Sequence, residues 1–345
     1  MEPIINMMSS ATKVKGQGVG SAYIEQVNLV KEKLGGKFKI LENARVKADI
    51  THYHTIDPKF SLTRKSRTKR GKSLGYVHML PETVDQSLSL PKFARKIFYK
   101  YMIAFYKSMD YLVTVNPYFI GELERYGVLR EKVSYIPNYV SSDAFYPLPK
   151  EKKKVLRGEY DIPEDKFVVL SAGQLQTRKG VFTFLEMAER LPEVQFVWAG
   201  GFSFGRISDG YAKIKKVTEN PPPNVKFLGI IDRELMNGVY NLADIMLLAS
   251  FEELFPMTVL EAMCTNTPIL LRDLEIYEDI LFDFYFKEKD TAGFVEAVRR
   301  LANDRDYYGQ GVEMAKKGNA FYSKESVADM WEELYVKIYK NEKID

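Results

Sequence analysis

Short apolar runs alternate with longer stretches of helical periodicity along the first part of the chain. The apolar runs are residues 4–8, 38–42, 49–54, 74–78 and 112–116, and helical patterns begin near Ala22 and after Leu90. Short apolar runs predict strands, whereas apolar positions spaced three or four residues apart predict helices. Because strands that alternate with helices usually pair in parallel, the pattern predicts a parallel sheet covered by helices.

The periodicity is lost after Asn138 and then returns. Residues 145–150 read Phe-Tyr-Pro-Leu-Pro-Lys and a Lys- and Glu-rich run follows, which is typical of a connection between domains. Further apolar runs are 167–172, 195–200, 225–228, 245–249 and 269–272, with helical patterns at 180–190 and 258–264. The fold class is thus predicted to be α/β, with two doubly wound Rossmann-like domains. The predicted bounds are 1–146 for the first domain, 147–153 for the linker and 154–320 for the second domain.

A final helix is predicted over residues 323–339, inside a C-terminal segment 321–345. Its apolar residues recur at helical spacing and form one stripe: Val327, Met330, Trp331, Leu334 and Ile338. The pattern does not identify what this stripe packs against, and the first domain is kept as the hypothesis.

The size and composition of the chain support two globular domains. A chain of 345 residues exceeds what one core usually serves, and 46% hydrophobic with 28% charged residues is ordinary globular composition. The single cysteine, Cys264, excludes an intramolecular disulfide and favours a reducing compartment. Residues 1–11 lack the basic and apolar parts of a signal peptide, and no apolar run approaches the ~18–20 residues of a membrane span. We therefore expect a cytoplasmic protein without a spanning helix.

Charge is distributed unevenly between the two halves. Residues 1–150 carry 24 Lys and Arg against 13 Asp and Glu, a net +11, and the remaining residues carry 26 against 33, a net −7. This asymmetry predicts that the first half faces an anionic partner, either nucleic acid or anionic lipid.

Two loops that follow predicted strands contain the residues best suited to chemistry. Doubly wound sheets bind ligands at the carboxyl ends of their strands, so the strand-to-helix loops are the place to search. The loop 250–256 carries Glu253, and the helix after it carries Glu261 within an apolar run where a charge needs a specific partner. The free amides of Phe255, Met257 and Thr258 at the start of that helix predict a phosphate site.

The second loop is Gly173 to Gly180, which follows a predicted strand and opens a helix. Glycine lets the backbone turn close to a ligand, and Arg178 with Lys179 can neutralise a diphosphate through charge-assisted hydrogen bonds. This loop therefore predicts stabilisation of a leaving diphosphate.

These motifs together resemble the large retaining family 4 of glycosyltransferases, which has the GT-B architecture of two Rossmann-like domains facing across a cleft. The resemblance spans the chain and depends mainly on Arg178-Lys179-Gly180 and on Glu253-x7-Glu261; supporting segments are 225–229, 240–244 and 267–269. The chain is most similar to the diglycosyl-diacylglycerol synthases of Gram-positive bacteria, the alpha-galactosylglucosyldiacylglycerol synthases. The segments that carry this closer similarity are 16–19, 38–43, 52–57, 75–81 and 198–205.

The resemblance implies a role for each matching residue. Arg178 and Lys179 would hold the diphosphate of a UDP-sugar, Glu253 the hydroxyls of the donor sugar and Glu261 the ribose, while His78 would lie near the reacting face of the sugar. The implied catalytic residues are Glu253, Arg178, Lys179 and His78. The implied donor-binding residues are Gly16, Gly18, Gly173, Gly229, Ile230, Phe255, Pro256, Met257, Thr258 and Glu261.

The family's chemistry carries further expectations. It uses neither a cofactor nor a catalytic metal, and its retention is described as a same-face substitution in which the leaving phosphate oxygen helps to deprotonate the acceptor hydroxyl. One departure is Pro256, where many relatives have glycine, which removes one amide from the loop. The implied reaction moves a hexose, galactose favoured, onto glucosyl-diacylglycerol, as in synthesis of the glycolipid anchor of lipoteichoic acid. UDP-glucose as donor, and diacylglycerol as acceptor, remain alternatives.

A basic and aromatic helix is predicted after Leu90. No acidic residue occurs between Asp85 and Asp110, and cations alternate there with aromatic side chains. The residues expected to bind a membrane are Lys92, Arg95, Lys96, Phe98, Lys100 and Phe105, and the basic run 64–72 would reinforce them. Such a helix places its apolar side in the lipid interface and its cations at anionic headgroups, which predicts peripheral binding to the inner face of the cell membrane. No nucleic-acid-binding signature accompanies the charge.

Other functions fit single motifs. The glycines at 16, 18 and 20, with Glu42, imitate a dinucleotide fingerprint, but the third glycine falls one residue early. His52, His54 and Asp57 are too few and too isolated to predict a metal site. A hydrolase using Glu253 and Glu261, and a sugar-nucleotide-binding protein without catalysis, also remain open.

Overall fold

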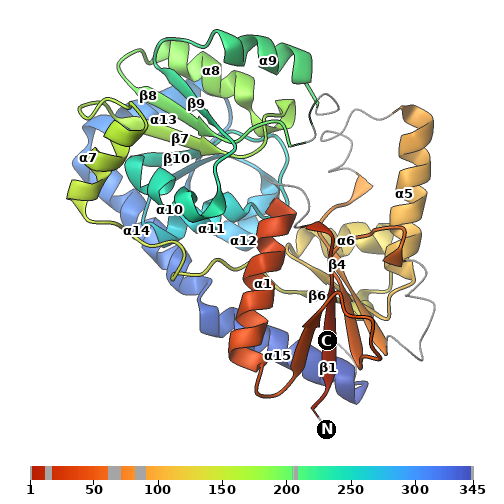
Figure 1. Ribbon diagram of the computed structural model, residues 1–345. Helices are drawn as coiled ribbons and strands as arrows, with labels where there is room; N and C mark the ends of the chain where they lie inside the picture. Colours follow the sequence, from red (N-terminus) through yellow and green to blue (C-terminus); the bar gives the residue numbers. More distant parts are fainter. Residues whose placement is uncertain are drawn as a thin grey trace.

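The computed structural model describes residues 2–11, 18–60, 71–81, 91–203, 205 and 209–342, folded into two α/β units (Figure 1). Gly16 and residues 64–70 of the basic run lie outside these ranges. Each unit is built on a six-stranded sheet whose strands pair in parallel, with orders β2-β1-β3-β4-β5-β6 and β12-β11-β10-β7-β8-β9. The predicted fold class of two Rossmann-like domains is confirmed.

The first domain contains six strands with helices between them. Its strands are β1 Ile4–Met8, β2 Lys39–Glu42, β3 Ile50–Tyr53, β4 Lys72–Val77, β5 Tyr111–Thr114 and β6 Val133–Tyr135. Its helices are α1 Gly18–Leu34, α5 Lys92–Lys107, α6 Tyr118–Arg125 and the 3-10 turn η2 Arg130–Lys132.

The second domain repeats this arrangement. Its strands are β7 Val168–Ala172, β8 Gln195–Ala199, β9 Val225–Gly229, β10 Ile245–Leu248, β11 Ile269–Arg272 and β12 Phe286–Glu288. Its helices are α7 Lys150–Glu159, α8 Val181–Arg190, α9 Tyr211–Glu219, α10 Arg233–Leu242, α11 Met257–Cys264, α12 Glu278–Leu281, α13 Thr291–Asn303 and α14 Arg305–Phe321, with 3-10 turns η3 Thr177–Lys179 and η5 Glu275–Tyr277. Within the predicted linker 147–153, the chain is already helical from Lys150, because Pro149 is compatible with a helix start.

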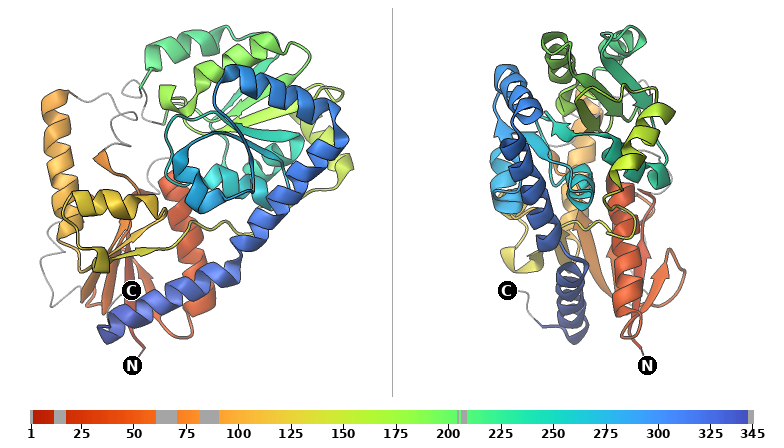
Figure 2. Two further views of the ribbon diagram at one scale, coloured as in Figure 1. Left: turned by 180° about the vertical axis from the view of Figure 1, so that it is seen from behind. Right: turned by 90° about the vertical axis from the view of Figure 1, so that its left-hand side faces the viewer.

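The last helix, α15 Lys324–Lys340, returns from the second domain to the first. Figure 2 shows α14 and α15 as a continuous blue path that runs down the second domain and ends beneath the first sheet. There α15 packs against α1 and β3, and Trp331, Tyr335 and Ile338 are fully buried. The hydroxyl of Tyr335 lies 3.0 Å from Nδ1 of His52 on β3. The C-terminal helix therefore completes the core of the first domain.

The three histidines of the chain form an aromatic group with α15, in which His52 and His54 are buried and His78 is half-buried. His52 and His54 have ring centroids 4.1 Å apart, Tyr76 stacks on His78 at 4.1 Å, and Trp331 packs on His52 at 5.3 Å. Burial lowers the pKa of His78 to about 3 and lowers the pKa values of His52 and His54 well below 6.5. All three imidazoles are therefore neutral in the folded protein at neutral pH.

We expect this histidine group to make the fold sensitive to acid. The unfolded chain binds protons below about pH 6.5 while the folded imidazoles do not, so stability decreases as pH falls, by up to ~1.4 kcal/mol per pH unit for each histidine. Urea unfolding measured between pH 7.5 and 5 would show this slope. Neither ring nitrogen of His54 has a hydrogen-bond partner in the described residues, so His54→Phe removes no such bond. The variant should lose the contribution of one histidine to the pH dependence of the unfolding free energy, up to ~1.4 kcal/mol per pH unit. An unchanged slope in His54→Phe contradicts the prediction.

Candidate active site at the junction of the domains

The loop between β10 and α11 brings Glu253 next to the cations predicted to act with it. Glu253 is 8% exposed and forms an ion pair with Nζ of Lys179 on η3. Arg178 forms two hydrogen bonds with the same loop. Its Nη1 donates to the Glu252 carbonyl at 3.0 Å, and its backbone carbonyl accepts from the Phe251 amide at 2.7 Å. The structure thus brings Glu253 to Arg178 and Lys179, although it lies more than 70 residues from them in sequence.

Gly180 makes this close approach sterically feasible. Its φ of +73° lies in the left-handed region, and an added Cβ would lie 2.3 Å from the carbonyl oxygen of Ala249. A larger residue at this position would push η3 and the start of α8 away from the end of β10. The glycine of the Arg-Lys-Gly motif therefore sets the distance between the two cations and the Glu253 loop.

Burial and charge act in opposite directions on the Lys179–Glu253 pair. Burial acts to raise the pKa of Glu253, but the charges of Lys179 and Arg178 outweigh it and hold that pKa below its ordinary value. Burial lowers the pKa of Lys179, against the attraction of Glu253. Glu253 is accordingly a carboxylate at neutral pH.

The start of α11 supplies backbone donors beside this pair. Pro256 is the N-cap in an extended conformation and has no N–H, while the amides of Met257 and Thr258 fall in the first turn, where a helix offers them no acceptor. The side chains of Phe255 and Met257 are buried. The backbone amides of this turn are thus available to a prospective anion, together with the Thr258 hydroxyl, which has no hydrogen-bond partner in the described residues.

Glu261 is placed differently from Glu253. Its Oε1 accepts from Nη1 of Arg233 at 2.8 Å and its Oε2 from the hydroxyl of Tyr240 at 2.7 Å. Arg233 also pairs with Glu25 on α1, so a guanidinium joins carboxylates of both domains. The buried charge of Glu261 therefore finds its partner within the protein, in Arg233. The contact of Glu261 with the ribose stays a prediction. Sequence inspection missed Arg233, Tyr240 and Glu25.

The remaining predicted site residues follow strands of the two sheets or begin a helix. Gly173 follows β7 with φ +144°, and an added Cβ there would meet nothing within 4 Å. Gly229 ends β9, and Ile230 after it is partly exposed. Gly18 begins α1. His78 follows β4, and its Nε2 is buried without a hydrogen-bond partner in the described part of the chain.

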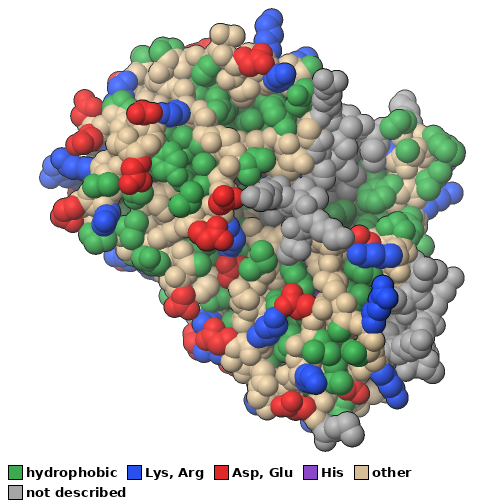
Figure 3. All heavy atoms as spheres, in the orientation of Figure 1, with side chains coloured by type: hydrophobic (Ala, Val, Ile, Leu, Met, Phe, Trp, Pro, Cys, Tyr) green, Lys and Arg blue, Asp and Glu red, His purple; other side chains and the backbone are tan. Residues whose placement is uncertain are grey.

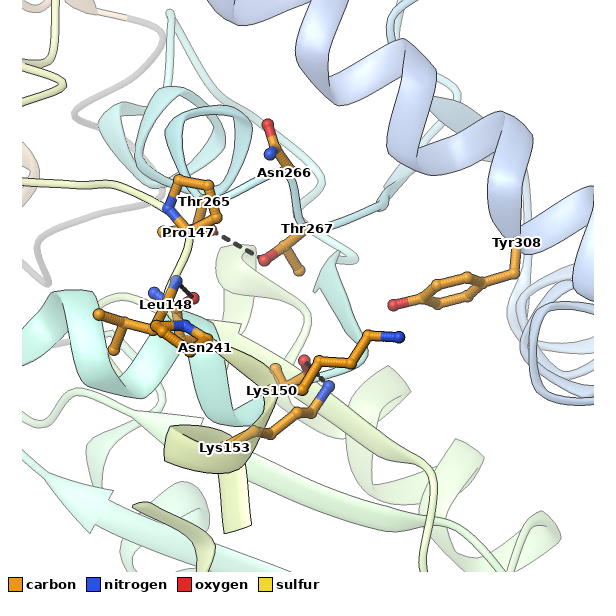
Figure 4. Close-up of a pocket in the computed structure, with 11 residues that line it drawn as sticks. Pro147, Leu148, Lys150, Lys153, Asn241, Thr265, Asn266, Thr267 and Tyr308 are labelled. Carbon is orange, nitrogen blue, oxygen red and sulfur yellow. Dashed lines mark hydrogen bonds between the residues drawn. The ribbon is translucent and has the colours of Figure 1, made fainter. Parts of the chain in front are cut away.

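A cavity of about 150 Å³ lies elsewhere, at the linker (Figure 4). It is lined by residues of the linker, α7, α10, α14 and the turn before β11, and contains none of the predicted site residues. Lys153, one of its two lysines, is neutralised by Asp244 at 2.6 Å. This cavity is therefore separate from the candidate active site.

Helix α5 exposes different apolar residues from those predicted. Phe93 is 78% and Ile97 53% exposed, whereas Phe105 is 1% exposed within the first domain's core. The prediction that Phe105 contacts a membrane is wrong, because helical phase turns that residue inward. Phe98 is half-buried, Arg95 is partly exposed, and Lys96 and Lys100 are exposed. In Figure 3 apolar and basic side chains gather over α5, at the right of the molecule.

Membrane-crossing helices and metal-ligand clusters are both absent from the described residues. No helix in these ranges is long and apolar enough to cross a bilayer. Within the same ranges, no group of three or more His, Cys, Asp and Glu side chains is arranged to hold a metal ion.

Comparison with known proteins identifies relatives over nearly the whole chain. Residues 152–318 match the family described as "Glycosyl transferases group 1". The chain is 43% identical over 333 residues to the alpha-galactosylglucosyldiacylglycerol synthase of Streptococcus pneumoniae, covering 96% of this chain and 89% of that protein. It is 27% identical to the processive diacylglycerol alpha-glucosyltransferase of Acholeplasma laidlawii over 78% of each chain. The structure of Anabaena Alr3699/HepE in complex with UDP-glucose aligns with a TM-score of 0.76 at 13% identity, over 97% of this chain and 99% of that one.

Proposed function

This chain belongs to the family of the alpha-galactosylglucosyldiacylglycerol synthases, within the group 1 glycosyltransferases, and on that premise we propose which sugar it moves, and how. It is a hexosyltransferase that acts on diacylglycerol glycolipids. The donor is UDP-galactose, the acceptor is glucosyl-diacylglycerol, and the configuration of the transferred sugar is retained. The product is a diglycosyl-diacylglycerol, suited to anchor lipoteichoic acid.

The observation that carries this proposal is the buried Lys179–Glu253 pair beside Arg178 and the first turn of α11. Three positive sources converge there: two side-chain cations and the amides of a helix N-terminus. A diphosphate that leaves a sugar gains negative charge, and preorganised donors stabilise that charge most when water is excluded. UDP-glucose in the similar Anabaena protein supports a nucleotide-sugar donor.

The site residues bind different parts of the donor. Arg178 and Lys179 hold the diphosphate together with the amides of Met257 and Thr258. Glu253, already charged, accepts hydrogen bonds from the hydroxyls of the hexose. The open backbone at Gly173 and at Gly229-Ile230 receives the nucleoside, with Glu261 directed to the ribose. His78, neutral and with a free Nε2, can hydrogen-bond to the sugar from the first domain.

The transfer follows a same-face route. The bond from the anomeric carbon to the phosphate oxygen breaks, the acceptor oxygen bonds to that carbon on the same face, and the acceptor proton passes to the departing phosphate. Lys179 and Arg178 stabilise the UDP as it leaves. Glu253 does not form a covalent intermediate, because its carboxylate is held by Lys179.

The acceptor is a membrane lipid, and α5 supplies the contact surface. Phe93 and Ile97 enter the interface while Arg95, Lys96 and Lys100 meet anionic headgroups; the side chain of Lys92, which was predicted to join them, lies outside the described part of the structure. The protein thus binds peripherally to the inner face of the cell membrane. No step requires a cofactor or metal.

Product analysis tests the proposed reaction. The protein is incubated with labelled UDP-galactose or UDP-glucose and with diacylglycerol or glucosyl-diacylglycerol in anionic micelles. We expect one labelled diglycosyl lipid, from UDP-galactose and glucosyl-diacylglycerol. Longer products from UDP-glucose would favour the alternative that the similarity to the Acholeplasma enzyme supports. UDP-sugar binding without transfer to any lipid would instead identify a non-catalytic binding protein.

A further inference from the structure

Two asparagines of the first domain reach into the second domain beside Glu253. Asn116 lies just beyond β5 and Asn138 just beyond β6, at the carboxyl ends of two neighbouring strands. Both side chains are buried. At this position both side chains face the second domain across the junction between the domains.

Each asparagine donates to backbone carbonyls of the second domain. Nδ2 of Asn116 donates to the carbonyls of Leu254 and Ile276, each at 2.9 Å, and its Oδ1 accepts from the Tyr118 amide at 3.0 Å. Nδ2 of Asn138 donates to the carbonyl of Phe255 at 2.9 Å. Both amide hydrogens of Asn116 are thus used on the other domain, while its oxygen fixes the orientation of the amide.

The carbonyls that accept these bonds belong to two turns of the candidate site. Leu254 and Phe255 directly follow Glu253, and Ile276 directly precedes Tyr277. The ring of Tyr277 is fully buried, and its hydroxyl has no hydrogen-bond partner within the described ranges. Asn116 therefore holds the Glu253 loop and the Tyr277 turn at a fixed separation.

Irregular loops need such contacts, because no strand or helix satisfies their carbonyl groups internally. A buried carbonyl without a donor is costly, so the loop adopts the conformation that keeps all three bonds. We propose that Asn116 and Asn138 are positioning residues for the transfer reaction, through which the first domain sets the conformation of the donor-binding loop. This inference rests on the proposed function of that loop.

The two domains are consequently coupled at the donor site. Removing either asparagine loosens the loop that carries Glu253, although neither residue need touch the donor. The effect falls on donor affinity and turnover, while the lipid surface of α5 is unchanged. A purely structural asparagine would instead lower the fraction of folded protein and leave the kinetic constants of that fraction unaltered.

The test compares Asn116→Ala and Asn138→Ala with Asn6→Ala. Asn6 is an equally buried asparagine of the first domain, but its amide donates to Ala44 of the same domain at 2.8 Å. Amide hydrogen exchange of the intact protein reports loop order without any substrate. Steady-state transfer, with the acceptor saturating, reports KM for the UDP-sugar and kcat.

We expect faster exchange in residues 251–255 of both site variants and in residues 275–277 of Asn116→Ala, but in neither segment of Asn6→Ala. We also expect the donor KM of Asn116→Ala to rise about tenfold. The loss of one hydrogen bond of ordinary strength corresponds to this factor. The acceptor KM should stay within twofold. Exchange equal to wild type, or loosened loops with unchanged donor KM and kcat, would overturn the proposal. If wild-type protein transfers no sugar, the proposed function fails, while the exchange result still decides whether the asparagines order the loop.

Discussion

Replacement of Lys179 by alanine is expected to lower kcat for glycosyl transfer by a factor of roughly 100 to 1,000, the usual effect of deleting one preorganised donor at a developing negative charge. The side chain of Lys179 is 13% exposed and pairs with the buried Glu253, so no water replaces its ammonium group at low cost. Initial rates at saturating UDP-sugar and lipid measure the change. Near-wild-type turnover would remove the proposed role.

Two further variants separate a direct role from a structural one. Lys153→Ala deletes a lysine of the same domain that is also paired with a carboxylate, Asp244, but lies at the linker, so its kcat should be unchanged. If Lys179 served only to neutralise Glu253, the double variant Lys179→Ala/Glu253→Gln would turn over as fast as Glu253→Gln alone. If Lys179 stabilises departing UDP, the double variant is much slower than Glu253→Gln, while its thermal stability exceeds that of Lys179→Ala because no unpaired carboxylate remains buried.

Replacement of both Phe93 and Ile97 by aspartate is expected to weaken binding to vesicles rich in phosphatidylglycerol by at least about a hundredfold. Burying each of these side chains contributes ~1.5–3 kcal/mol, and an added carboxylate opposes the anionic surface. Vesicle sedimentation measures the loss, and wild-type binding should fall as salt rises. Affinity for UDP should not change, because neither Phe93 nor Ile97 is among the donor-binding residues.

Leu129→Asp is the matched control for this experiment. Leu129 is also an exposed apolar residue of the first domain, 55% accessible, but it adjoins η2 rather than lying on α5. Its substitution should leave vesicle binding intact. Equal loss in Leu129→Asp, or equal wild-type binding to neutral vesicles, contradicts a specific contact through α5.

The parts of this fold that the sequence predicts are those with local causes. Apolar runs followed by helical periodicity identify strands and helices, because the pattern arises within a few residues. The meeting of Arg178, Lys179 and Glu253 is also predictable, since all three follow parallel strands and carboxyl ends share one edge of a sheet. That argument needs strand direction but no detail of packing.

The parts that sequence inspection missed depend on how separate elements dock. Arg233 and Glu25 pair only because α1 and α10 meet across the domains, and nothing near either residue signals it. Asn116 and Asn138 are ordinary loop residues until the second domain is in place. On α5, aromatic residues occur all around the helix, so composition does not distinguish exposed Phe93 from buried Phe105.

The return of α15 to the first domain has a consequence for biosynthesis. The first sheet emerges early from the ribosome, yet part of the apolar cover over its histidines, Trp331 and Tyr335, is translated only after the second domain. The early half therefore remains incompletely covered while the second domain is made. Synthesis of α15, and not completion of the first half, is what permits native packing there.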